Sequence, residues 1–152
     1  YAGETLVVPI TNSNIENIYI GNNPIYFLNT GIYNNENDNS NVLYFIVNNY
    51  KFLLMGDASK IREKDILETY NLEDIDFLKI GHHGSNTSSS KEFIESINPK
   101  YNLISVGVDN KFNHPRKEVL KILSNRKIYR TDKEGTIEII IKKNKYKILT
   151  NS

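Results

Sequence analysis

Asp57 and the adjacent pair His82-His83 are the residues whose types and positions best fit chemistry on metals and phosphates. Asp57 follows an apolar run, and a carboxylate held at the end of a strand can bridge two divalent cations. The histidine pair lies between Gly81 and Gly84 after a second apolar run, and neutral imidazole is the commonest side-chain ligand of zinc. A plain turn residue explains Asp57 equally well on its own, so the glycine-flanked pair is the more specific signal.

Hydroxyl side chains follow the histidine pair in the sequence Ser85-Asn86-Thr87-Ser88-Ser89-Ser90. Hydroxyl and backbone donors near the start of a helix suit the oxygens of a phosphate group. The remaining histidine, His114, precedes Pro115, where a helix is expected to begin after another strand. His114 is therefore a candidate metal ligand, proton donor or phosphate contact, with a helix-capping histidine as the alternative.

Two further polar groups are weaker candidates. The sequence Asn37-Asp38-Asn39-Ser40 precedes a buried strand and is typical of a loop that hydrogen-bonds to itself, although it could also line a metal pocket. Arg130 stands before a predicted tight turn at residues 132–135 and could face a phosphate. We favour a structural role for Arg130.

The pattern of apolar and polar residues predicts an α/β domain with these motifs at strand ends, where sites in such sheets are built. Helices are expected at residues 60–70 with Ser59 as N-cap, from an S-x-x-E capping pattern at Ser89 to residue 97, and from Pro115 onward. Residues 1–152 are expected to form a single domain. Strands are expected at residues 6–10, 18–20, 25–29, 42–47, 50–55, 77–80, 103–106, 127–130, 136–141 and 145–149.

Composition narrows the function classes. The net charge of +1 excludes a strongly basic nucleic-acid coat but not a local phosphate site. Cysteine is absent, which excludes disulfides, thiolate metal sites and cysteine nucleophiles. No apolar run approaches the roughly 20 residues of a membrane span, and the N-terminus does not have the pattern of a signal peptide. Because the sequence starts without methionine, we expect a fragment of a longer protein.

Taken in series, these motifs resemble the metallo-β-lactamase superfamily, and more closely the C-terminal hydrolase domain of the ComEC family, the DNA-internalisation proteins of natural competence. The resemblance spans roughly residues 25–141, in the family's order and spacing. The motifs that carry it are NDNS at residues 37–40, FLLMGD at 52–57, IDFLKIGHHGS at 75–85, SSS at 88–90, ISVG at 104–107, HP at 114–115 and YRTD at 129–132.

The resemblance implies an α/β fold, a metallo-β-lactamase-like αββα sandwich represented mainly by its C-terminal half, that hydrolyses phosphodiesters at a divalent-metal site. By that resemblance Asp57 and His82 are ligands of zinc or manganese, and His83, Ser85 and His114 are catalytic residues that contact phosphate or handle protons. The implied substrate is DNA, during natural transformation. The implied parent protein is embedded in the membrane with other competence proteins, with this domain on the extracytoplasmic face of the cell membrane.

The sequence departs from the superfamily in one respect, because it lacks the motif His-x-His-x-Asp-His and has no histidine before His82. The chain thus offers about two ligands, whereas a catalytic zinc uses three protein ligands and a water. We expect the fragment to bind metal weakly, to be a poor catalyst, and to expose a sheet face or self-associate. Alternatives are a secreted hydrolase of a small phosphodiester, such as a phosphocholine ester, and a non-catalytic module that binds single-stranded DNA.

Overall fold

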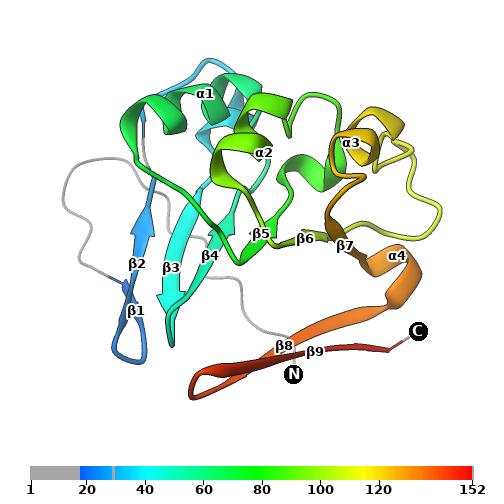
Figure 1. The fold of residues 1–152 in the computed structure, drawn as a ribbon. Helices are drawn as coiled ribbons and strands as arrows, with labels where there is room; N and C mark the ends of the chain where they lie inside the picture. Colours follow the sequence, from blue (N-terminus) through cyan, green and yellow to red (C-terminus); the bar gives the residue numbers. More distant parts are fainter. Residues whose placement is uncertain (1–17, 29, 152) are drawn as a thin grey trace.

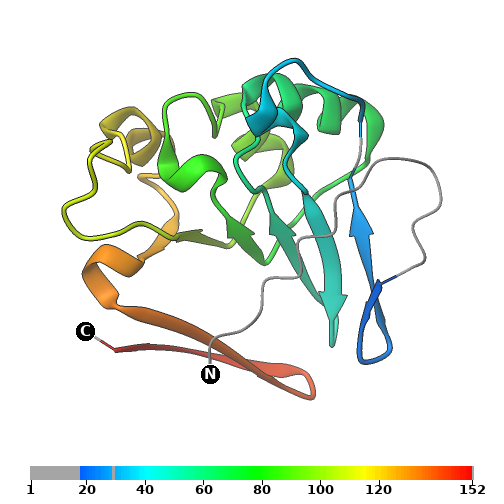
Figure 2. The same ribbon diagram turned by 180° about the vertical axis from the view of Figure 1, so that it is seen from behind.

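The structure, a computed structural model, describes residues 18–28 and 30–151, so the strand predicted at residues 6–10 lies outside the described residues. The fold is mixed α/β: a layer of helices covers one face of a seven-stranded sheet, and a two-stranded hairpin lies on the other (Figures 1 and 2). The strands of the large sheet, in spatial order, are β1 (Ile18–Ile20), β2 (Asn23–Phe27), β3 (Leu43–Val47), β4 (Tyr50–Leu54), β5 (Phe77–Lys79), β6 (Tyr101–Ile104) and β7 (Lys127–Arg130). The helices are α1 (Lys60–Thr69), α2 (Lys91–Ile97), α3 (Lys117–Ile122) and the single turn α4 (Thr131–Glu134), and the hairpin is β8 (Thr136–Lys142) with β9 (Lys145–Asn151).

The large sheet has an antiparallel half and a parallel half that meet at β4. Strands β1 to β4 pair antiparallel, and Asn48 and Asn49, both with positive φ, form the predicted turn between β3 and β4. Strands β4 to β7 pair parallel, with α1, α2 and α3 as the connections between them. The carboxyl ends of these four strands therefore lie along one edge of the sheet.

The three long helices pack on one face because apolar side chains of helices and strands are buried together there. Leu53 and Leu78 project from β4 and β5, and Ile66, Phe93 and Val119 project from α1, α2 and α3. All five are buried almost completely. Each burial of this kind contributes roughly 1.5–3 kcal/mol, so this core fixes the connections that lead to the strand ends.

The hairpin covers the opposite face over β4 to β6, where aromatic rings stack. The Phe77 ring stacks on the rings of Phe52 and Tyr101, with centroid distances of 4.7 Å and 5.3 Å. Tyr146 of β9 stands edge-on to Phe77 at 5.3 Å, and its hydroxyl shares a 2.8 Å hydrogen bond with that of Tyr101. The expectation of a bare sheet face is therefore wrong for this part of the sheet, because the chain's own hairpin buries it.

The predicted helix caps are confirmed at α1 and corrected at α2. Ser59 caps α1, and its hydroxyl accepts the N–H of Ile61. Helix α2 is capped by Ser90 and not by Ser89, because the carboxylate of Glu63 accepts the N–H groups of both serines. Ser89 is thereby held with a φ of 60°, outside the helical region.

Strand β6 and the turn after Arg130 differ from their predictions. Strand β6 runs from Tyr101 to Ile104, earlier than the predicted 103–106, because the N–H and C=O of Val106 both bond the Thr131 hydroxyl instead of a neighbouring strand. The predicted tight turn after Arg130 is the one-turn helix α4.

Candidate metal and phosphate site

The residues selected from the sequence lie along the carboxyl edge of the parallel strands, as predicted. Asp57 follows β4, the histidine pair follows β5, and Ser105 follows β6. These segments connect the sheet to α1, α2 and α3 at one end of the molecule (Figure 1). Their position agrees with the rule that sites in parallel sheets form beyond the carboxyl ends of the strands.

The polar loop before β3 holds the backbone of Asp57. The Asp57 N–H donates to the Ser40 hydroxyl over 3.2 Å, and a Cβ at Gly56, where φ is 56°, would lie 2.9 Å from the Ser40 Cβ. Asp38 is buried and accepts the N–H of Ser59 over 2.7 Å. Residues 37–40 therefore support the site, while the Asp57 side chain keeps 41% of its surface exposed and free for a ligand.

The histidine pair occupies the tight turn Gly81–Gly84, and both histidines have positive φ, 45° for His82 and 54° for His83. Only glycine fits at position 84, because a Cβ there would lie 2.5 Å from the Cβ of Pro115. Left-handed backbone at non-glycine residues costs of order 1–3 kcal/mol and tends to persist at functional sites. Two such residues in succession favour a functional role over incidental surface histidines.

Each imidazole of the pair is oriented through its Nδ1 atom. His83 Nδ1–H donates to the Ser105 carbonyl over 2.6 Å, and its Nε2 lies 3.9 Å from Oδ1 of Asp57. His82 Nδ1 lies 3.3 Å from the Thr87 hydroxyl, and the His114 ring lies 5.8 Å from the His82 ring. Histidines that bind metals are usually oriented in this way by a partner on the second ring nitrogen.

The hydroxyl run folds back on itself beneath the histidine pair. Ser85 is buried, and its hydroxyl lies 2.9 Å from that of Thr87. The buried Ser88 hydroxyl donates to the carbonyls of Gly81 and Ser85 over 2.8 and 3.0 Å. Thr87 is exposed beside His82. The structure therefore favours Thr87 over Ser85 as the hydroxyl that meets a ligand, with Ser85 orienting it.

Glu63 of α1 anchors the far end of this loop and was missed from the sequence. Its carboxylate is 1% exposed and accepts the N–H of Ser89 and, over 2.8 Å, that of Ser90. Burial raises the pKa of the Glu63 carboxyl, and the hydrogen bonds from the two serines lower it. A glutamate within a charged helix gives no sequence signal of this role.

His114 is held beside the pair by the segment that precedes α3. The Asn110 side chain accepts the His114 N–H and donates to the His114 carbonyl, both over 2.8 Å. The Arg116 N–H donates to the Gly84 carbonyl over 2.9 Å, which keeps this segment extended. For that reason α3 begins two residues after Pro115 and not at Pro115 as predicted.

We expect His114 to titrate below pH 6.5. Burial lowers its pKa most, and the nearby positive charges of His82, Arg116 and His83 lower it further. The folded chain thus binds this proton more weakly than the unfolded chain, so the stability linked to His114 is complete above pH 6.5 and is lost as the pH falls. An NMR titration of the ring protons checks this. A midpoint at or above 6.5 contradicts it, and a His82→Asn variant should shift the midpoint upward.

The lowered pKa favours the neutral form of the His114 imidazole, which can accept a hydrogen bond or bind a metal.

Two further charged residues lie near this edge, Arg130, which the sequence analysis considered, and Lys79, which it did not. Arg130 makes a bidentate ion pair with Asp132, 3.0 Å from Nε to Oδ1 and 2.6 Å from Nη2 to Oδ2, and this lowers the pKa of Asp132. The structural role favoured for Arg130 agrees with that pairing.

Lys79 was missed from the sequence. Burial lowers the pKa of its ammonium group, and the negative charge of Asp57 raises it. A lysine inside the apolar run of residues 77–80 was the available signal.

The side chains of the site are of the types that bind divalent cations, but too few of them are grouped to complete a ligand set. Asp57 Oδ1 and His83 Nε2 are separated by 3.9 Å, about 0.5 Å more than the roughly 3.4 Å between two ligand atoms of one tetrahedral zinc ion, so a modest movement of either side chain would let both bind the same ion. Among residues 18–28 and 30–151, however, no three His, Cys, Asp or Glu side chains are grouped closely enough to hold a metal ion. The described residues therefore offer part of a ligand set.

Comparison with known proteins gives three related bacterial sequences. The chain is 36% identical to ComE operon protein 3 of Bacillus subtilis over 105 residues, which are 68% of this chain and 14% of the relative. It is 34% identical to competence protein ComA of Neisseria gonorrhoeae over 107 residues, 68% of this chain and 15% of the relative. It is 36% identical to recombination protein 2 of Haemophilus influenzae over 92 residues, 59% of this chain and 11% of the relative.

These relatives point to the ComEC family of competence proteins. The chain spans about one seventh, or less, of the length of the ComEC-type relatives it matches. No model of a known protein family matches the chain. Within the part of the chain that the structure describes, none of the helices has the length and apolar character needed to cross a membrane.

Proposed function

We propose that this chain is part of the hydrolase domain of a ComEC-type DNA-uptake protein and takes part in the hydrolysis of DNA phosphodiesters during natural transformation. One observation carries the proposal: a carboxylate, three imidazoles and a hydroxyl-rich loop meet at the carboxyl edge of parallel strands. The competence relatives support the choice of DNA as the substrate. We further propose that the domain lies on the extracytoplasmic side of a membrane-embedded parent protein that works with other competence proteins.

The proposed cofactor is a divalent metal, zinc or manganese. Asp57 and His82 are the ligands that the family resemblance implies, and the 3.9 Å separation from Asp57 adds His83 to them. Such a metal supplies two kinds of chemistry, a lowered pKa of bound water and polarisation of a phosphoryl oxygen. The remaining ligands would come from segments other than those described, as the family's His-x-His-x-Asp-His motif implies.

The chain's own residues have separate proposed tasks. The Thr87 hydroxyl, oriented by Ser85, would donate to a non-bridging phosphate oxygen beside His82. His114, neutral near pH 7, would accept a hydrogen bond or bind the metal on the same side. We also propose that the helix layer and large sheet form the larger part of a metallo-β-lactamase-like sandwich, with the hairpin as part of its second sheet.

Metal binding by the 152-residue chain tests the proposed ligands. Calorimetric titration with zinc and manganese should show weak binding, and Asp57→Ala or His83→Ala should weaken it at least about tenfold because each removes a direct ligand. His82→Ala tests the assignment made from the resemblance. The matched control is Glu92→Ala, an exposed carboxylate of α2, which should leave binding unchanged. Binding that survives unchanged in all three site variants contradicts the proposed ligand set.

A further inference from the structure

Six exposed lysines gather where the hairpin turn meets the amino ends of the parallel strands, and we call them the lysine patch. Lys142, Lys143, Lys145 and Lys147 lie at and beside the turn between β8 and β9. The other two are Lys100, just before β6, and Lys127, the first residue of β7; all six are exposed.

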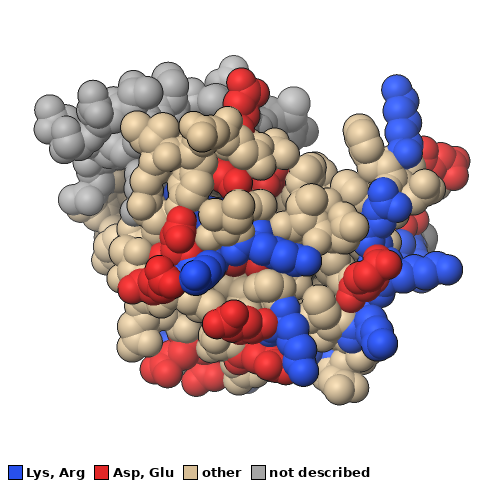
Figure 3. All heavy atoms as spheres, turned by 90° about the horizontal axis from the view of Figure 1, so that it is seen from above, with Lys and Arg blue, Asp and Glu red and all other residues tan. Residues whose placement is uncertain are grey.

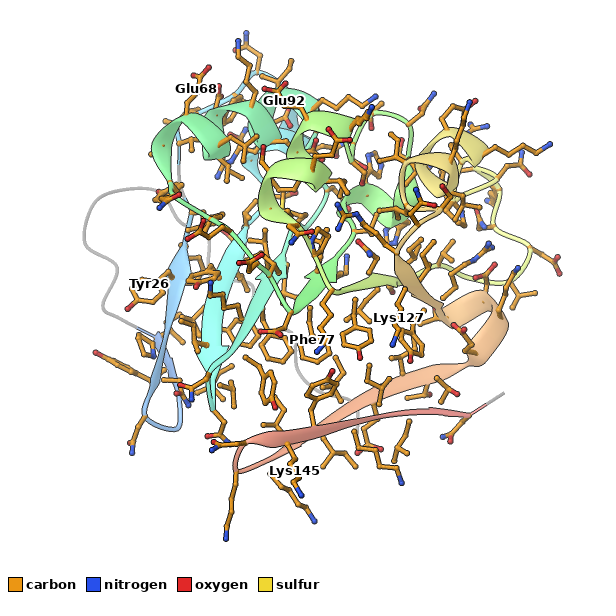
Figure 4. The ribbon with its side chains drawn as sticks, viewed as in Figure 1. Tyr26, Glu68, Phe77, Glu92, Lys127 and Lys145 are labelled. Atoms are coloured by element: carbon orange, nitrogen blue, oxygen red, sulfur yellow. The ribbon has the colours of Figure 1, made fainter. Side chains whose placement is uncertain are left out.

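The two parts of the lysine patch are joined through a pair of tyrosines. Lys100 Nζ lies 5.1 Å from the ring centre of Tyr146, the residue between Lys145 and Lys147. Lys127 Nζ lies 5.5 Å from the ring centre of Tyr101, whose hydroxyl bonds that of Tyr146. Figure 4 shows Lys127 on the sheet side of the hairpin and Lys145 at its turn end. Because successive side chains of a strand point to opposite faces, Lys145 and Lys147 project away from the sheet while Tyr146 packs on it, so the two parts of the lysine patch lie on the two sides of the hairpin next to its turn.

The hairpin gains no stability from this crowding of charge. Lys142 is directly opposite Lys145 in the strand register, and like charges in that relation destabilise a sheet. None of the four hairpin lysines forms an ion pair with any residue in the described part of the chain. Glu138 is the one acidic residue of the hairpin. A hydrogen bond with Tyr146 and, more weakly, the negative charge of Asp76 raise the pKa of Lys100, which keeps that ammonium group charged. The lysine patch thus leaves a strong positive charge facing solvent.

The helix layer treats its lysines differently. Lys64 of α1 and Lys91 of α2 each pair with a glutamate one turn further along the helix. Seen from above the helices, blue and red side chains alternate over the surface (Figure 3). Since the whole chain has a net charge of only +1, the unpaired charge at the hairpin is a local feature and not a general basic character.

We infer that the lysine patch binds the phosphate backbone of single-stranded DNA and guides the strand toward the carboxyl edge. Lysines act as point charges toward phosphates and read no bases, so binding should not depend on sequence. Large apolar side chains with high exposure, which a membrane-surface helix or hairpin inserts into lipid, do not occur among described residues 136–151. The choice of DNA over another polyanion rests on the proposed function.

The position of the lysine patch fits a strand that passes over the molecule. The patch lies at the amino ends of the parallel strands, since Tyr50, the first residue of β4, bonds Asn144 in the hairpin turn. The site around Asp57 lies at their carboxyl ends. With five residues and a rise of about 3.3 Å per residue, β4 spans about 13 Å along the sheet, and Asp57 lies three residues beyond its end.

Fluorescence anisotropy with a labelled oligo-dT probe, measured in chelator to prevent cleavage, tests this inference in the 152-residue chain. The variant carries Lys→Gln at residues 142, 143, 145 and 147. Because each neutralised phosphate contributes about −0.7 to the slope of log K against log salt, the slope should become shallower by about 2–3. Affinity at about 0.1 M salt should fall at least about tenfold. A mixed-sequence probe should give the same result.

The matched control removes four exposed lysines from the helices, at residues 64, 91, 117 and 121, and should keep the wild-type slope. An equal loss in this control means that net charge alone matters and overturns the inference. Unchanged DNA binding by the hairpin variant, with loss of binding to phosphatidylserine vesicles, assigns the patch to lipid and also overturns it. The hairpin variant should bind zinc like wild type, because none of its four lysines belongs to the proposed ligand set, so failure of the hydrolase proposal and failure of this one can be told apart.

Discussion

Replacing Asp57 by alanine in a longer protein that contains this chain is expected to lower kcat/KM for DNA cleavage by at least about 10²-fold, or about 2.7 kcal/mol in transition-state stabilisation. The carboxylate lies 3.9 Å from His83 Nε2 at the centre of the site, and its backbone is fixed by Ser40, so the loss is one of chemistry and not of folding. Its 41% exposed side chain makes few packing contacts to lose.

Steady-state kinetics on a labelled oligonucleotide check this expectation, with thermal unfolding measured on the same preparations. His83→Ala should show a loss of similar size. Glu92→Ala removes an exposed carboxylate from α2 and should retain wild-type kinetics. Ser85→Ala should reduce the rate less than Thr87→Ala, because the Ser85 hydroxyl acts through that of Thr87.

Phe77→Ala is expected to destabilise the chain by about 3–5 kcal/mol. The ring is completely buried between Phe52 and Tyr101, with Tyr146 of the hairpin edge-on to it. Truncation leaves a cavity between the large sheet and the hairpin and removes four ring contacts together, the fourth being with Tyr50. Against the roughly 5–15 kcal/mol that stabilise ordinary domains, this loss threatens folding at 37 °C.

Denaturant unfolding followed by circular dichroism measures this loss. Phe112→Ala is the control, because that ring is 68% exposed, and it should change stability by less than about 0.5 kcal/mol. A loss below about 1.5 kcal/mol for Phe77→Ala would mean that the hairpin does not pack on the sheet as described.

The arrangement of the site edge followed from the sequence because it depends on local patterns. Apolar runs ending at Asp57 and at Gly81 marked two strand ends, and parallel strands bring their carboxyl ends to one edge. The histidine pair was visible because glycines flank it. Ser59 was recognised as a cap because capping needs only neighbouring residues.

Features that depend on partners distant in the sequence were not predicted. Arg62 is 1% exposed and donates to the carbonyls of Asp38 and Leu28, although its helix pattern suggests a surface residue. Glu63 displaced the cap of α2 from Ser89 to Ser90 through bonds across 26 and 27 residues. Strands β8 and β9 were expected, but their place over the aromatic face was not, because alternation of residues shows that a strand has an apolar face without showing what covers it.

The roles within the histidine pair also needed three dimensions. His82 and His83 are adjacent, and only the positive φ of both residues determines which ring faces Asp57. The structure gives His83 that position, while His82 lies between Thr87 and His114. The family resemblance had implied His82 as the metal ligand.

The most direct measurement of the central claim is cleavage of end-labelled single-stranded DNA by a longer protein that contains this chain, assayed with chelator and with added zinc or manganese. The account predicts cleavage that stops with chelator, returns with metal, and is lost in Asp57→Ala although that variant remains folded. Cleavage at the full rate by Asp57→Ala, or cleavage unaffected by chelator, would contradict it.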